Sequence, residues 1–240
     1  MSPTLLQQME ESATNHEIPV AALLRKALIL SKRLRYPPLG EWAKHELEGY
    51  PKDVDLPDYR AYRRCQVLGD FSGPMGSGMR NQPIPSGNVQ EDDQHALFGF
   101  ELREGVPKYQ TLVDNGGSGL AIPWDQNYVA RYQEDFYEAY ALSSARRVLG
   151  LGDLAQVLEG VRTRLLNFSL EIEETNPAAG EAEAGTTPVP PEKVNTAFHL
   201  HVSGDHNIVT TAGRDLTQQL SLDESRWCRR RLKTPHPSPV

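Results

Sequence analysis

The pattern of apolar and polar residues first becomes regular close to the N-terminus. Spacings of three and four separate the apolar positions and place them on one helical face: Val20, Leu23, Leu24, Ala27, Leu28 and Leu34. This spacing predicts a helix over residues 19–35, which cannot continue because two prolines follow. A second helix is predicted over 39–48, with Trp42 facing inward and Gly49 as its C-terminal cap. The two helices should form a hairpin.

The longest helical pattern lies near the middle of the chain. Its apolar positions keep helical spacing throughout: Leu154, Val157, Leu158, Val161, Leu165, Phe168 and Ile172. They predict an amphipathic helix over 153–174, and Asp153 can cap it by accepting a hydrogen bond from a free amide. A shorter helix is expected over 125–133, after Pro123.

Three segments lack clear helical spacing and contain β-branched and aromatic residues. They predict strands or short mixed structure near 58–70, 96–113 and 136–148. Residues 71–85 carry many glycines and prolines and are expected to form a loop. Together these segments predict an α+β fold. In it, the helical hairpin and the long C-terminal amphipathic helix pack on a small, mostly antiparallel sheet.

The composition changes after this body, which we define as residues 1–174. Residues 175–192 contain no Leu, Ile or Phe. They cannot bury enough apolar area to offset the entropy of ordering them, so we expect a disordered linker. The chain ends in a basic, proline-rich segment, 223–240, which is expected to be a disordered tail.

Between linker and tail, residues 193–222 show a different pattern. Phe198, Leu200 and Val202 alternate with other residues, and glycines follow, which predicts short β rungs. So small a β unit leaves strand edges unpaired, and we therefore expect self-association of the chain through residues 196–220.

Charge and composition narrow the classes of protein. The chain has 240 residues and a formal net charge of −7, and counting shows that residues 1–174 alone carry −7. An acidic body disfavours nucleic acid except at local basic patches. No run of about 18 apolar residues exists, which argues against a membrane-spanning helix. No secretory signal is evident, and the two cysteines, Cys65 and Cys228, are too few for a disulfide scaffold, so we expect a cytoplasmic protein.

Candidate chemistry is sparse. Arg60, Arg63 and Arg64 lie among Tyr59 and Tyr62, a basic and aromatic pattern that can hold a nucleic-acid backbone, although a solvated strand face has the same pattern. His45 could act as a general base, but a single histidine is not specific for catalysis.

Two further patterns suggest weak sites. The loop with Gly73, Gly76 and Gly78 could bind an anion through backbone amides with the help of Arg80, or it could be a purely structural loop. His199 and His201 would share one face of a strand, but no complete ligand set accompanies them. The sequence therefore predicts neither a metal site nor a cofactor.

Five segments in order resemble the AbiTii domain family across roughly residues 4–174. They are LLRKALILSKRL, EWAKHELEGYP, LPDYR, FSGPMGSGMRNQPIP and VRTRLLNFSLEIEE. The positions that match its motifs are Glu46, Leu47, Gly49, Tyr50, Leu56, Pro57, Tyr59, Arg60, Gly73, Pro74, Gly76, Gly78, Asn81 and Pro85. The resemblance implies a role in abortive infection, a bacterial response to phage, and it supplies no catalytic residues.

Three hypotheses for the function follow from this resemblance. The first is a phage-defence effector, or an effector-associated module, with undefined chemistry. The second is an RNA-directed nuclease toxin that uses His45, Arg60 and Arg63. The third is a non-enzymatic adaptor that binds other defence proteins. The sequence favours the first, because no acid–base pair has convincing spacing.

Overall fold

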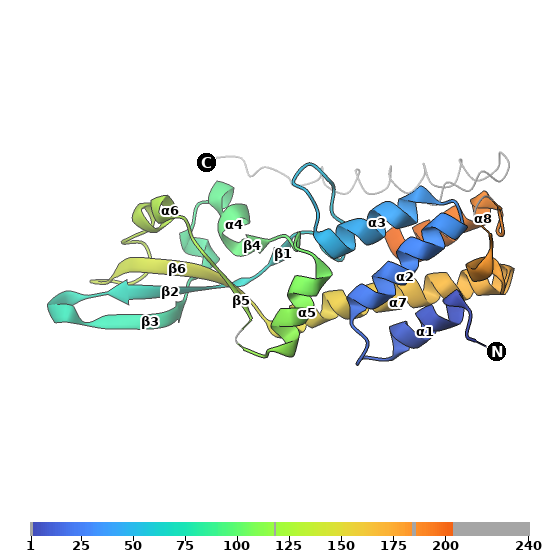
Figure 1. Cartoon of the computed structure of the whole chain (residues 1–240). Coiled ribbons are helices and arrows are strands. Elements are labelled where there is room, and N and C mark those ends of the chain that lie inside the picture. The colour runs from blue at the N-terminus through green and yellow to red at the C-terminus, as the bar shows by residue number, and fades with distance from the viewer. Residues whose placement is uncertain (1, 118, 184–185, 204–240) are drawn as a thin grey trace, which may run out of the picture. The chain divides into compact units, whose positions relative to one another are not determined.

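The computed structural model describes residues 2–117, 119–183 and 186–203, and its α+β architecture confirms the predicted fold class (Figure 1). The helices are α1 (Leu5–Thr14), α2 (Val20–Arg33), α3 (Pro37–Glu48), α4 (Glu91–Phe98), α5 (Val106–Asp114), α6 (Gln126–Arg131), α7 (Leu151–Thr175) and α8 (Pro191–Phe198). The strands are β1 (Arg63–Arg64), β2 (Gln66–Ser72), β3 (Gly78–Pro83), β4 (Gly99–Phe100), β5 (Leu120–Pro123) and β6 (Ala141–Leu149).

The helices at 19–35, 39–48 and 153–174 are confirmed as α2, α3 and α7. Helix α3 begins two residues early because its first positions are prolines, which a first helical turn tolerates. Helix α1 was not predicted, although a capping box marks its start. The Thr4 hydroxyl accepts a hydrogen bond from the Gln7 amide, and the Thr4 amide donates one to the Gln7 side chain. Its buried side chains pack on α2 and α7.

The helices share one apolar core. Fully buried side chains from α1, α2, α3 and α7 form its centre: Leu6, Met9, Leu24, Leu30, Leu39, Leu165 and Phe168. Helix α8 adds Val194, which is also fully buried. The regular spacing seen in the sequence is therefore the buried face of this helical bundle.

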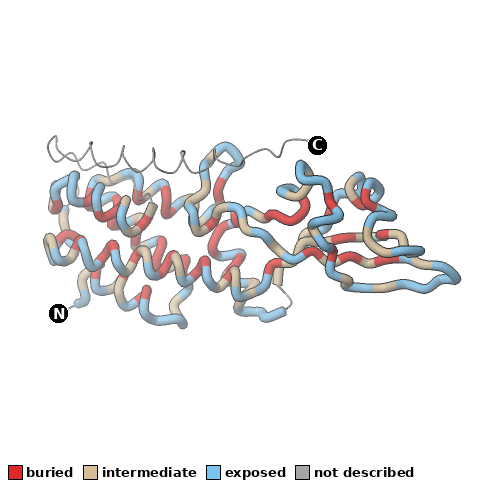
Figure 2. The backbone as a smooth tube through the Cα atoms, turned by 180° about the vertical axis from the view of Figure 1, so that it is seen from behind, coloured by how far each residue is buried: buried red, intermediate tan, exposed pale blue. Residues whose placement is uncertain are grey.

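The four-stranded sheet has the order β3-β2-β6-β5, and every pair in it is antiparallel. A second apolar core lies on this sheet beneath α4 and α6, with Val67, Phe71 and Trp124 among its buried residues. Figure 2 shows buried positions both along the helices and along the strands. The helices thus pack mainly on one another, and the sheet carries a core of its own.

The predictions for two segments, 71–85 and 96–113, are wrong. Residues 71–85 are not only a loop, because β3 pairs with β2 and closes a hairpin at their tip. Residues 96–113 are mainly helical, since α4 ends at Phe98 and α5 begins at Val106. In α5, Val106 and Tyr109 are fully buried at helical spacing, and Pro107 occupies the first turn, where it is tolerated.

The other strand and helix predictions are closer to the structure. The segment 58–70 contains a turn before β1 and β2, and the segment 136–148 contains β6, which starts at Ala141. Helix α6 confirms the short helix expected over 125–133. Strand β5 was not predicted because it is an edge strand of only four residues, too short to show an alternating pattern.

The described part of the expected linker is ordered and partly buried. Ala179, in a 3-10 turn over Ala179–Glu181, and Val189 are both fully buried against the helical core. A linker without large apolar residues was expected to stay disordered. Small side chains suffice here because the gap beside α1 admits only small groups, and a Cβ on Gly180 would lie 3.1 Å from the Leu5 Cβ.

The expected β rungs are helical where the structure describes them. Helix α8 continues into a π-helical turn over His199–Ser203, and Phe198 and Val202 both face the helical core. Their spacing of four fits a helix face as well as a strand. Residues 204–222 and the tail 223–240 lie outside the described residues, and self-association through 196–220 stays a prediction. No helix in the described ranges combines the length and apolar character needed to cross a membrane.

A first prediction concerns two carboxyl groups that face each other between α1 and α7. Burial, and next the negative charge of Glu173, raise the pKa of Glu10. The folded chain therefore holds this proton more tightly than the unfolded chain, and the stability it contributes is lost as the pH rises through the folded pKa. We expect Glu10→Gln to raise the unfolding free energy at pH 7 by about 0.5 kcal/mol, and to change it less at pH 4.

Urea unfolding at the two pH values measures this difference. The matched control is Glu11→Gln, which removes the same charge from an exposed position on the same helix. Equal effects of both variants at pH 7 would contradict the prediction, because a general reduction in negative charge would then explain the gain.

Candidate functional site

A buried ion pair joins two of the motif residues. Glu46 lies on α3, and Arg60 lies in the turn that precedes β1. Both side chains are fully buried, and Arg60 Nε donates to Glu46 Oε1 at 2.9 Å and to Oε2 at 3.1 Å. The inward spacing of Leu39, Trp42, Ala43 and Glu46 already signals that Glu46 shares the buried face of α3.

Every polar atom of this pair has a partner. The hydroxyls of Tyr50 and Tyr59 donate to Glu46 Oε1 at 2.7 and 2.6 Å. Arg60 Nη1 donates to the carbonyls of Leu102 and Glu104 at 2.7 and 2.9 Å. Burial, and next the charge of Glu46, raise the pKa of both tyrosines, so their hydroxyls stay protonated. The cluster ties α3 to the chain around β4 and leaves no group of it open to a substrate.

This arrangement corrects the sequence interpretation of Arg60. The guanidinium was expected on a solvated basic and aromatic strand face, but it is enclosed within the protein. Arg63 donates to Gln156 Oε1 on α7 at 3.0 Å and to the carbonyl of Tyr59 at 3.1 Å. His45 lies against the ring of Tyr50, 5.2 Å between ring centres. All three residues assigned to a nuclease are engaged in structural contacts.

The glycine-rich segment is the tip of the β2–β3 hairpin, at the end of the sheet away from the helical bundle (Figure 1). Gly76 has a φ of +78°, which a residue without Cβ adopts readily, and a Cβ on Gly73 would lie 2.4 Å from the Tyr140 ring. The amide of Asn81 donates to Asp70 Oδ1 at 2.8 Å, so it is occupied by a carboxylate of the protein itself. Arg80 is exposed on β3, and Figure 1 shows that β3 lies far from α3, the helix that carries Glu46.

The two described histidines of the C-terminal segment also lie differently from the expectation. His199 and His201 are on a helical turn, where residues two apart do not share a face. His201 Nε2 lies 3.8 Å from Glu171 Oε2, and His199 Nδ1 lies 3.1 Å from Ser203 Oγ. Within the described ranges no three His, Cys, Asp or Glu side chains lie close enough together to hold a metal ion.

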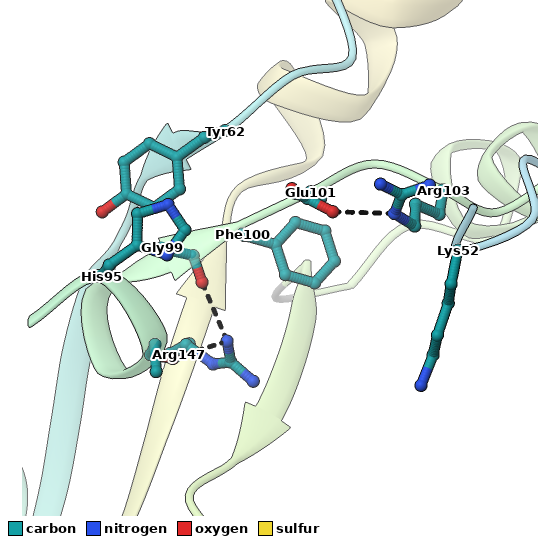
Figure 3. Close-up of a pocket in the computed structure, with 9 residues that line it drawn as sticks. Lys52, Tyr62, His95, Gly99, Phe100, Glu101, Arg103 and Arg147 are labelled. Carbon is teal, nitrogen blue, oxygen red and sulfur yellow. Dashed lines mark hydrogen bonds and ion pairs between the residues drawn. The ribbon is translucent and has the colours of Figure 1, made fainter. Parts of the chain in front are cut away.

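A groove that the sequence did not predict lies beside the short β1–β4 ladder (Figure 3). Its volume is about 510 Å³, and its lining includes Lys52, Tyr62, His95, Phe100 and Arg147. The Tyr62 ring, 40% exposed, stacks on His95 with 4.2 Å between ring centres and 17° between planes.

Glycine at position 99 is required for this stack. A Cβ there would lie 1.7 Å from Tyr62 Cε2 and 2.4 Å from the carbonyl oxygen of His95. The Tyr62 ring therefore rests directly on the backbone of β4. Any larger residue would push the ring out of its place at the edge of the groove.

Two arginines hold the walls of the groove. Arg147 on β6 donates from Nη1 to the carbonyls of Ala96 and Gly99 at 3.0 and 2.8 Å. Arg103 pairs with Glu101 at 2.7 Å and donates to the carbonyls of Pro51 and Val54, at 2.6 and 3.0 Å. Because Lys52 lies between these two carbonyls in sequence, Arg103 fixes the loop that brings Lys52 to the groove.

The groove residues are scattered along the sequence. They come from the loop after α3, the segment before β1, the end of α4, β4 and β6. Among the groove residues, Tyr62 was singled out from the sequence, as part of a basic and aromatic pattern on a predicted strand. The others could not be connected without the two-residue ladder that pairs Arg63 with Phe100 and Arg64 with Gly99.

A protein-family model described as AbiTii matches residues 4–198. The chain belongs to the AbiTii family. The match extends the resemblance seen in the sequence from residue 174 to residue 198, so it includes α8. Comparison with curated proteins and with solved structures gives no significant match.

Membership in the AbiTii family points to abortive infection in phage defence as the process in which this chain works. It does not assign a reaction to the groove. The buried cluster contains four AbiTii motif positions: Glu46, Tyr50, Tyr59 and Arg60. Their role in it is to stabilise the fold. The groove lies next to that cluster, because Tyr62 follows Arg60 by two residues and leads into β1.

Proposed function

We propose that this AbiTii chain is an effector module of abortive infection that acts by binding a ligand in the groove beside β1 and β4. The observation that carries this proposal is the contrast between two sets of polar residues. The residues assigned to catalysis are enclosed or engaged in structural contacts, whereas Lys52 and Tyr62 are exposed on a concave surface.

The size and lining of the groove support a binding role. Sites for small ligands typically have volumes of about 300–1,000 Å³ and combine aromatic walls with a few polar groups. The groove has about 510 Å³, aromatic walls at Tyr62 and Phe100, and cationic groups at Lys52 and Arg147. Its walls are fixed by hydrogen bonds to backbone carbonyls, so the site is formed before a ligand arrives.

Expression in a bacterium with and without phage tests the proposal. We expect the wild-type chain to lower phage yield in infected cells. The double variant Lys52→Glu, Tyr62→Ala should lose most of this protection, because it reverses one charge and removes one aromatic wall without touching the buried cluster. Cell growth and phage yield are both measured, with protein levels compared by immunoblot.

The matched control is Lys193→Glu, a charge reversal at an exposed position of α8 away from the groove. It should protect as well as the wild type. Full protection by the double variant would contradict the proposal. Cleavage of bacterial RNA by the purified chain that is lost in His45→Ala would also contradict it and favour the nuclease hypothesis.

A further inference from the structure

The groove differs in charge from the protein that carries it. The chain has a net charge of −7, whereas the groove lining contains Lys52, Arg103 and Arg147 against the single acidic residue Glu101. Arg103 and Glu101 pair with each other, which leaves the other two cations without a carboxylate in the lining. A cationic recess on an acidic surface selects an anionic ligand.

The two remaining cations have donors to spare. Lys52 is exposed, and its Nζ forms no hydrogen bond or ion pair with any residue that the structure describes. Arg147 uses Nη1 for two carbonyls, and its Nη2 forms no hydrogen bond with any residue that the structure describes. An anion in the groove can accept hydrogen bonds from these two unused donors.

The aromatic walls add a second requirement for the ligand. Tyr62 has one face on His95 and Gly99 and remains 40% exposed. In the view of Figure 3 the Phe100 ring lies between the side chains of Arg147 and Lys52. A flat ring can therefore stack in the groove while an attached anionic group reaches the cations.

We propose that the groove binds a nucleotide with an unpaired base, which stacks on the aromatic walls while its phosphate lies between Lys52 and Arg147. This inference rests on the proposed function, because it names the ligand class of the same site. A paired base in a duplex has both faces stacked and cannot enter such a recess. The ligand is either a free mononucleotide or one nucleotide of a single strand, which share this chemistry.

Another groove in the described part of the chain does not share these properties. It lies between α2 and α3, has a volume of about 770 Å³, and is lined by Glu41 and Glu48 as well as by Lys32, Arg35 and Lys44. Its aromatic residue, Tyr36, donates its hydroxyl to Asn195 and packs edge-on against Phe198. Its two carboxylates make this groove less favourable for an anion, and Tyr36 is already engaged by other side chains.

Fluorescence anisotropy with the purified full-length chain tests the inference. One arm uses a labelled single-stranded RNA of twelve nucleotides, and the other uses a labelled adenosine monophosphate. Binding of either probe is expected, and the stronger arm identifies the source of the nucleotide. Tyr62→Ala should weaken binding about tenfold or more, since stacking of one base on an aromatic ring carries an effect of this size.

Charge and control variants complete the experiment. Lys52→Glu should also weaken binding about tenfold and reduce its dependence on salt, because one phosphate contact is lost. Lys193→Glu should bind as the wild type does. Absence of binding in both arms overturns the inference, and so does binding that neither groove variant weakens or that Lys193→Glu weakens equally.

The two proposals can fail separately. If the groove variants abolish protection from phage but no nucleotide binds, the groove is the working site and its ligand is not a nucleotide. If nucleotides bind in the groove but the variants still protect, the ligand is identified and the proposed function is wrong. Circular dichroism of every variant excludes a loss of folding as the cause.

Discussion

Arg60→Met is expected to lower the free energy of unfolding by about 3–5 kcal/mol, the cost of leaving a buried charge without its partner. In the wild type, the Glu46 carboxylate accepts from Arg60 and from the two tyrosine hydroxyls inside a fully buried cluster. Removal of the guanidinium also leaves the carbonyls of Leu102 and Glu104 without their donor. Denaturant unfolding followed by circular dichroism measures the loss.

The matched control for this variant is Arg131→Met. Arg131 forms a comparable pair with Asp93 at 2.8 Å, but its side chain is 56% exposed. A surface pair of this kind contributes about 0–1 kcal/mol, so the control should unfold near the wild-type midpoint. If the two variants unfold at the same denaturant concentration, the buried cluster is not the stabilising centre described above.

Gly99→Ala is expected to destabilise the chain by about 1–3 kcal/mol and to abolish ligand binding in the groove. The added Cβ would overlap the Tyr62 ring at 1.7 Å and the His95 carbonyl oxygen at 2.4 Å. The ring can move, but the backbone oxygen cannot move without shifting the end of α4. Both walls of the groove would change, because Arg147 also donates to the carbonyl of Gly99.

Gly87→Ala provides the control for the added methyl group. Gly87 lies in the 3-10 turn Ser86–Asn88, and a Cβ there would meet no atom within 4 Å. Its unfolding midpoint and its affinity for the anisotropy probe should match the wild type. Normal probe binding by Gly99→Ala would show that the Tyr62 stack does not form part of the binding site.

Variants of the buried cluster and variants of the groove must be interpreted differently in experiments on this AbiTii chain. A loss of protection in an Arg60 variant would reflect unfolding, because this side chain makes only structural contacts. A loss in a Tyr62 or Lys52 variant is informative about function, since both side chains are exposed at the groove and neither belongs to the buried cluster. Two neighbouring members of one basic and aromatic segment therefore have different roles.

Helical periodicity predicted three helices of the bundle. The spacing of apolar residues in α2, α3 and α7 predicted every end of these helices to within two residues, because each helix buries one face in a single core. The α+β class and the family followed in the same way from local patterns and ordered motifs. These features depend on residues close together in sequence, which is why they can be predicted.

The tertiary structure decided the rest. Phe198, Leu200 and Val202 fit a strand by their alternation, but the helical core offers a surface that Phe198 and Val202 cover one helical turn apart. Arg60 and Tyr62 are two residues apart, but they have different surroundings. Arg60 is buried with Glu46 of α3, whereas Tyr62 lies on Gly99 of β4 and stays partly exposed. Burial and the convergence of distant side chains set the chemistry of a site, and neither is encoded in the spacing of neighbouring residues.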